Sequence, residues 1–153
     1  MPRSFIAFDP RSGRRDVVIE VHPELVDGAT EADVQQLERR LYDRRIHLGI
    51  LVTPRRAYFV RDTFSALEFS TESYDVGELD TVVLFSRTVR GPIAIDEGLY
   101  DQTKTWLDAV AGAWSSFVPD EALPFMLPEM IGGLAQSNME EWDDVLDVED
   151  AAQ

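Results

Sequence analysis

The sequence of 153 residues contains no cysteine, two histidines and one lysine. The absence of cysteine excludes disulfides, thiolate catalysis and zinc fingers. Two histidines also disfavour a metal site built from histidine alone. Any metal ion would therefore have to be a hard cation, such as Mg²⁺, held by carboxylates.

Long apolar runs are missing as well. No stretch reaches the roughly 18 apolar residues that a membrane-spanning helix needs, and the first nine residues have neither the apolar length nor the cleavage region of a secretory signal. We therefore expect a cytoplasmic protein that does not associate with membranes. Because 44% of the residues are hydrophobic, the chain can form the core of one compact domain.

Negative charge dominates, with a net charge of −15, but it is unevenly distributed. Residues 1–61 hold eleven arginines and nine acids, a net charge of +2, whereas residues 91–153 hold one lysine and fourteen acids, a net charge of −13. The amino-terminal part could meet a phosphate backbone, which the carboxy-terminal part would repel. We predict one domain over residues 1–136 and an acidic, flexible tail over 137–153. An alternative for the tail is a short helix from Trp142 that docks on a basic surface.

Apolar patterning predicts an α/β domain. Short apolar runs predict strands at 4–8, 15–22, 47–53, 57–60, 67–69 and 81–85. A turn is predicted at 9–14 and a loop from about 70 to 80. Amphipathic spacing predicts helices at about 31–45, after Thr30 as N-cap with Asp33 in a capping box, and at about 98–117, where Trp106 and Trp114 are predicted core anchors.

The strand from Arg15 that ends at Pro23 is the most informative stretch. Its side chains alternate between two faces, with Val17, Ile19 and Val21 on one and Asp16, Val18, Glu20 and His22 on the other. An acid and an imidazole side by side on an apolar strand indicate either a working site or the relic of one.

A hairpin with Glu-x-His on its second strand, followed by a helix and an apolar strand with a hairpin partner, resembles the PD-(D/E)XK nuclease superfamily. The nearest resemblance is to the amino-terminal nuclease domain of type I restriction subunits. It is carried by Val17–His22, Gln35–Leu37 and Leu48–Val60, and covers about residues 2–62. The resemblance implies a mixed sheet of five or six strands in restriction endonuclease-like topology, crossed by the helix at 31–45 and covered by the helix at 98–117.

In that family, an Asp on the first strand and the Glu of the E-x-K motif hold Mg²⁺, and the Lys orients the attacking water. The resemblance therefore implies Glu20 as metal ligand and His22 at the position of the Lys, which makes both candidate catalytic residues. Further candidate metal ligands are Asp9 and Asp16. Candidate nucleic-acid contacts are Arg14, Arg15, Gln36, Arg40 and Arg44.

Two departures from the family pattern weaken the expected chemistry. An imidazole is mostly neutral at pH 7 and does not replace the ammonium of the Lys. Pairing the first two strands about the turn also puts Arg3 opposite His22 and Phe5 opposite Glu20, so that Pro2-Arg3 falls where the family has Pro-Asp. Asp9, the one acid on the first strand, would lie roughly 13 Å along the sheet from Glu20, too far to share one ion.

We therefore predict a nuclease-fold domain with a degraded active site that acts as a nucleic-acid- or protein-binding component. A restriction or mobile-element setting is suggested by the resemblance alone. Two alternatives remain open: an active DNA endonuclease that depends on a divalent metal, and an unrelated small α/β interaction protein. In the simplest structural interpretation, Glu20 and His22 form a hydrogen-bonded pair at a strand end, with Arg3 as the ionic partner of Glu20.

Overall fold

The computed structural model describes residues 3–8, 15–46, 48–62, 74–96, 98–125 and 138–142. A six-stranded sheet in the order β5-β4-β3-β2-β1-β6 forms its centre. The strands are β1 (Arg3–Phe8), β2 (Arg15–Val21), β3 (Leu48–Val52), β4 (Arg56–Asp62), β5 (Tyr74–Asp80) and β6 (Asn138–Trp142). The helices are α1 (Glu31–Arg44), α2 (Thr81–Leu84), α3 (Gly98–Phe117) and the 3-10 helix η2 (Asp120–Phe125). Because β2 and β3 are parallel and the other neighbours antiparallel, the predicted α/β fold with a mixed sheet and flanking helices is confirmed.

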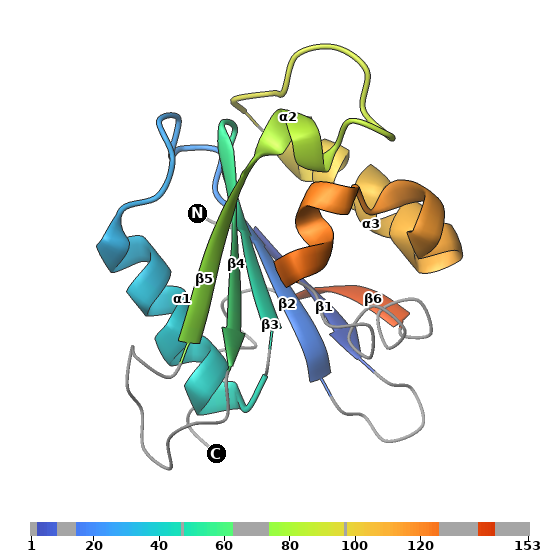
Figure 1. Ribbon diagram of the computed structural model, residues 1–153. Coiled ribbons are helices and arrows are strands. Elements are labelled where there is room, and N and C mark those ends of the chain that lie inside the picture. The colour runs from blue at the N-terminus through green and yellow to red at the C-terminus, as the bar shows by residue number, and fades with distance from the viewer. Residues whose placement is uncertain are drawn as a thin grey trace.

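Helices cover both faces of the sheet: Figure 1 shows α1 on one side and α3 on the other. Val17, Ile19 and Val21 belong to the apolar cluster that includes α3. Val18 belongs to the cluster on the α1 side, together with Leu37 of that helix. The alternation of β2 between two faces is therefore confirmed, and it supplies apolar side chains to both halves of the core.

The central strand β3 is buried along its whole length, as expected of a strand covered on both faces. Gly49 allows α1 to approach this strand closely. A Cβ atom at Gly49 would lie 3.1 Å from both Cδ atoms of Leu41 and 3.2 Å from Cδ1 of Leu37. The missing side chain therefore sets the separation between helix and sheet.

The start of α1 confirms the predicted capping box. The Thr30 hydroxyl accepts a hydrogen bond from the Asp33 amide at 3.2 Å, and the Asp33 carboxylate accepts one from the Thr30 amide at 2.8 Å. These bonds satisfy backbone donors that the first turn leaves unpaired. The helix ends at Arg44, and the C-cap residue Arg45 has a left-handed backbone with φ 57°. The chain then returns as β3, parallel to β2.

The prediction of a strand at 81–85 is wrong, because this segment contains the helix α2. Thr81, Leu84 and Phe85 are buried at helical spacing, whereas Val82 is 59% exposed. An apolar run this short has no periodicity that separates a buried strand from a turn of helix.

The sequence predicts a loop where β5 lies, which is also wrong. This edge strand has few apolar residues and is joined to β4 by cross-strand ion pairs, Arg61 with Asp75 at 3.0 Å and Arg56 with Glu78 at 3.3 Å. Charged side chains are common on edge strands, where they discourage aggregation. The edge strand predicted at 67–69 lies outside the described residues.

The predicted hairpin of β1 and β2 is confirmed, but its register differs by one residue. Ser4 lies opposite Glu20, and Phe5 lies opposite Ile19. Phe5 and Ile19 belong to the same buried cluster. Burial of one apolar face therefore decides the register, which counting outward from an assumed turn missed. The turn predicted at 9–14 lies outside the described residues.

The prediction of a flexible acidic tail over 137–153 is wrong for the first part of that range, because Asn138–Trp142 forms β6 and pairs antiparallel with β1. The alternative helix is also wrong at its first residue, since Trp142 belongs to this strand. Backbone pairing along the free edge of β1 overrides the polar, acidic composition of the segment. Residues 137 and 143–153 lie outside the described part of the chain.

The predicted helix at 98–117 is confirmed as α3. Trp106 is fully buried, with its ring centroid 5.7 Å from that of Phe85, and is a core anchor as predicted. The side chain of Trp114 lies outside the described residues. Within the described ranges, no helix combines the length and apolar character required to cross a membrane.

Candidate functional site

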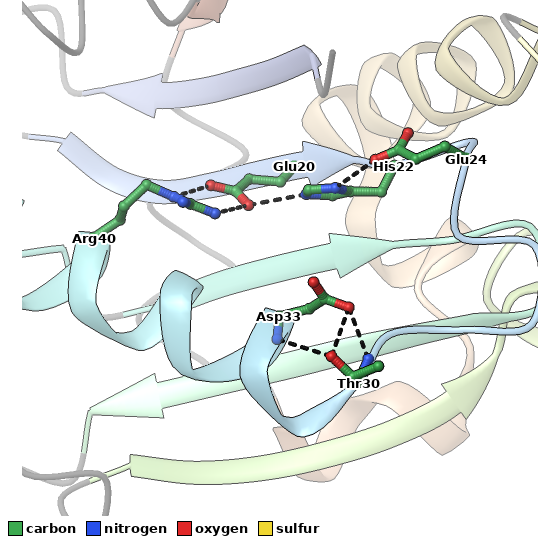
Figure 2. A network of polar contacts seen from close by, with 6 residues as sticks. All are labelled: Glu20, His22, Glu24, Thr30, Asp33 and Arg40. Carbon is green, nitrogen blue, oxygen red and sulfur yellow. Dashed lines mark hydrogen bonds and ion pairs between the residues drawn. The ribbon is translucent and has the colours of Figure 1, made fainter.

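Glu20 and His22 lie at the carboxyl end of β2, on the face of the sheet that α1 covers (Figure 2). The backbone amide of His22 donates to the carbonyl of Val52 at 2.9 Å, which continues the pairing with β3. Glu20 is 5% exposed. The strand thus places a carboxylate under the helix and an imidazole at its edge.

Arg40 of α1 binds the carboxylate of Glu20 through two hydrogen bonds. Its Nε donates to Oε2 at 2.6 Å and its Nη2 donates to Oε1 at 2.5 Å. This fork is the strongest geometry for a guanidinium and a carboxylate. The simplest structural interpretation named Arg3 as the partner of Glu20. In the structure Arg40 takes this role, and the side chain of Arg3 lies outside the described residues.

His22 lies between two carboxylates, as Figure 2 shows. Its Nε2 is 3.1 Å from Oε1 of Glu20, and its Nδ1 is 3.1 Å from Oε1 of Glu24. Ionised carboxylates only accept hydrogen bonds, and a neutral imidazole has one N–H. Both contacts are therefore hydrogen bonds only when the ring is protonated.

The pKa values of this pair are shifted in the directions that favour ions. Burial lowers the pKa of His22, but the hydrogen bonds and charges of Glu20 and Glu24 outweigh burial and raise it above 6.5. Burial raises the pKa of Glu20, but the hydrogen bonds and charges of His22 and Arg40 outweigh it and lower this pKa below 4.5. When the His22 ring is protonated, the site is a chain of alternating charges from Arg40 through Glu20 and His22 to Glu24.

Glu20 is poorly placed to hold a metal ion, because both of its oxygens already accept hydrogen bonds. Among the described residues, no group of three acidic or histidine side chains could hold a metal ion. Asp9 lies outside the described residues, and of Asp16 only the backbone, in β2, is described. The Mg²⁺ site built from these residues thus stays a prediction.

Three of the five candidate nucleic-acid contacts lie on α1, and their role in binding stays a prediction. Arg40 is turned to Glu20, Gln36 is exposed, and Arg44 is half-buried. Arg14 lies outside the described residues, and Arg15 is described only as backbone of β2.

The sequence analysis missed Glu24 as a site residue, and it named Arg40 as a nucleic-acid contact rather than as the partner of Glu20. Glu24 follows the strand after Pro23, and no sequence pattern connects its side chain to the imidazole. The helix phase puts Arg40 on one flank of α1 together with Gln36 and Arg44. The sequence does not reveal that this flank faces Glu20.

No protein-family model matches the chain, and no curated protein or solved structure matches it.

Proposed function

We propose that this chain is a non-catalytic, protein-binding domain whose nuclease-like strand has become part of the framework. The observation that supports this most is the engagement of the Glu20 carboxylate by Arg40 and His22. A metal-dependent nuclease needs an open carboxylate oxygen for its ion. Here an ion would first have to displace the fork of Arg40.

Displacement would be costly. Removing one partner of a fully buried ion pair typically costs about 3–5 kcal/mol, because the other charge remains buried and unpaired, and the cost is lower here because the Arg40 side chain is 36% exposed. The same pair has a structural use, since it links β2 to α1 across the interface of sheet and helix. An ionic contact at this position favours a supporting role over a catalytic one.

The overall charge favours a basic protein as partner. Residues 91–153, with a net charge of −13, would repel a phosphate backbone, and Arg40, one of the candidate nucleic-acid contacts, is already paired within the fold. The restriction or mobile-element setting rests on the resemblance alone.

The catalytic alternative is tested with supercoiled plasmid DNA and Mg²⁺ or Mn²⁺. We expect both the purified chain and Glu20→Ala to leave the DNA intact. If the wild type nicks the DNA and Glu20→Ala does not, the proposal is overturned.

Binding is tested by isolating the chain from its own cells and measuring the mass of the native particle. We expect a stoichiometric complex that re-forms from the purified partner. Recovery as a lone monomer would contradict the proposed binding function.

A further inference from the structure

Glu38 lies on the flank of α1 opposite Arg40, and among the described residues no donor pairs with its Oε2. The residue is 3% exposed, and among the described residues its Oε2 is a buried side-chain atom without a hydrogen bond. Burial, followed by the charge of Glu31, raises the pKa of Glu38. A buried acceptor without a donor destabilises a fold, and such groups in native proteins call for an explanation.

Glu38 lines a cleft of about 410 Å³ between α1 and the strands β4 and β5. Two more carboxylates, those of Glu31 and Glu78, also line this cleft. Glu31 accepts a hydrogen bond from Gln35 at 3.4 Å, and Glu78 accepts one from Arg56 at 3.3 Å. The described lining contains no arginine, lysine or histidine. The cleft therefore suits a cation.

The remaining walls are apolar or aromatic. Val34 and Val76 supply aliphatic surface, and Tyr58 supplies a ring. The ring is held in place because its hydroxyl accepts a hydrogen bond from the Ala29 amide at 3.0 Å. Aliphatic walls suit the stem of a long side chain, and an aromatic wall suits a cation.

An organic cation fits this cleft better than a metal ion. Within the described residues, the acidic side chains form no group that could hold a metal. The fold also shows how it satisfies a buried glutamate, because Glu20 receives the guanidinium fork of Arg40. Glu38 lacks an equivalent donor among the described residues, so its carboxylate is open to a guanidinium from a partner.

We infer that this cleft binds an arginine side chain from a basic segment of the partner protein, with Glu38 as the acceptor of its guanidinium. The inference rests on the proposed protein-binding function and names the chemistry of the partner. Val76 and Glu78 belong to β5, an edge strand of the described sheet. A segment that lies along this edge would present alternate side chains to the cleft.

The test uses the full chain and three short peptides that differ at one central residue: arginine, lysine or neutral citrulline. Binding is followed by backbone amide NMR shifts during titration. We expect the arginine peptide to shift the amides of residues that line the cleft, the lysine peptide to bind more weakly, and the citrulline peptide not to bind. Citrulline binding equal to arginine binding, or no shift at the cleft with any peptide, would overturn the inference.

Variants identify the acceptor. Glu38→Gln should weaken arginine-peptide binding at least about tenfold, as expected when a hydrogen bond to a charged group is lost. Glu121→Gln is the matched control, because it removes the same charge from an exposed residue of η2, and it should keep wild-type affinity. An equal loss in both variants would overturn the inference. If Glu38→Gln does not fold, Glu78→Gln, on the exposed rim, should weaken binding more than the control does.

The two proposals fail separately. Nuclease activity that depends on Glu20 would overturn the proposed function whatever the peptides do. Inert DNA and a stoichiometric partner, together with peptides that do not bind, would leave the proposed function standing and remove the cleft as its binding site.

Discussion

The guanidinium of Arg40 holds the carboxylate of Glu20 with two hydrogen bonds, of 2.6 and 2.5 Å, across the interface between α1 and β2. The two residues are 20 positions apart in the sequence. The contact joins the most informative strand of the chain to the helix that follows it. Its removal should therefore affect the whole fold, beyond any local function.

Arg40→Ala should lower the free energy of unfolding by about 2–3 kcal/mol. This is below the range for fully buried pairs because the Arg40 side chain is 36% exposed. Urea denaturation measures the change. Arg39→Ala is the control: its ion pair with Asp43, at 3.5 Å, is exposed, and its loss should cost less than about 1 kcal/mol. Equal losses in the two variants would show that the fork contributes no more than a surface pair.

The stability of the protein should fall as the pH rises above 6.5. The fold raises the pKa of His22, so the contribution of this residue is complete below pH 6.5 and is lost as the pH rises through the folded pKa. The fold lowers the pKa of Glu20, so its contribution is complete above pH 4.5 and is lost as the pH falls through its folded pKa. Stability should therefore be highest between the two transitions.

Urea unfolding from about pH 5.5 to about pH 9 tests the expected loss of stability as His22 loses its proton. His22→Gln should make the free energy of unfolding less dependent on pH in this range, because the glutamine side chain does not titrate. Glu24→Gln should give an intermediate slope, since it removes one of the two carboxylates that hold the proton. A slope unchanged in His22→Gln would assign the pH dependence to other groups.

Glu38→Leu should stabilise the isolated chain by about 1 kcal/mol, because it removes a buried acceptor that lacks a donor among the described residues. Leucine is also a good helix former and adds apolar surface beside Val34. Urea denaturation gives the change in free energy, and the arginine-peptide titration should show that binding is lost. Stabilisation at the expense of binding is typical of functional sites. Destabilisation would mean that Glu38 has a partner within the fold.

Gly49→Val should lower the free energy of unfolding by about 1–3 kcal/mol, the usual cost of overpacking a core. The added Cβ atom would already lie 3.1 Å from the Cδ atoms of Leu41. Leu41→Ala opens space at the same place, so the double variant should lose less stability than the sum of the single variants. Urea denaturation of all three variants tests this. Additive losses would show that the helix relaxes away from β3.

Local patterns in the sequence predicted the elements whose periodicity is long enough to read. The alternation of β2, the capping box of Thr30 and Asp33, and the long apolar face of α3 each depend on residues within a few positions of one another. Helical periodicity also puts Arg40 and Glu38 on opposite flanks of α1.

Contacts between segments that are distant in the sequence could be identified only from the tertiary structure. The run at 81–85 is helical in part, and Tyr74–Asp80 is a strand because β4 offers it a free edge with complementary charges. In the same way, the parallel return of β3 places α1 over β2, which brings Arg40 to Glu20 and leaves Glu38 above the cleft beside β5. Periodicity tells which face a residue occupies, whereas the packing of distant elements determines which residue it meets there.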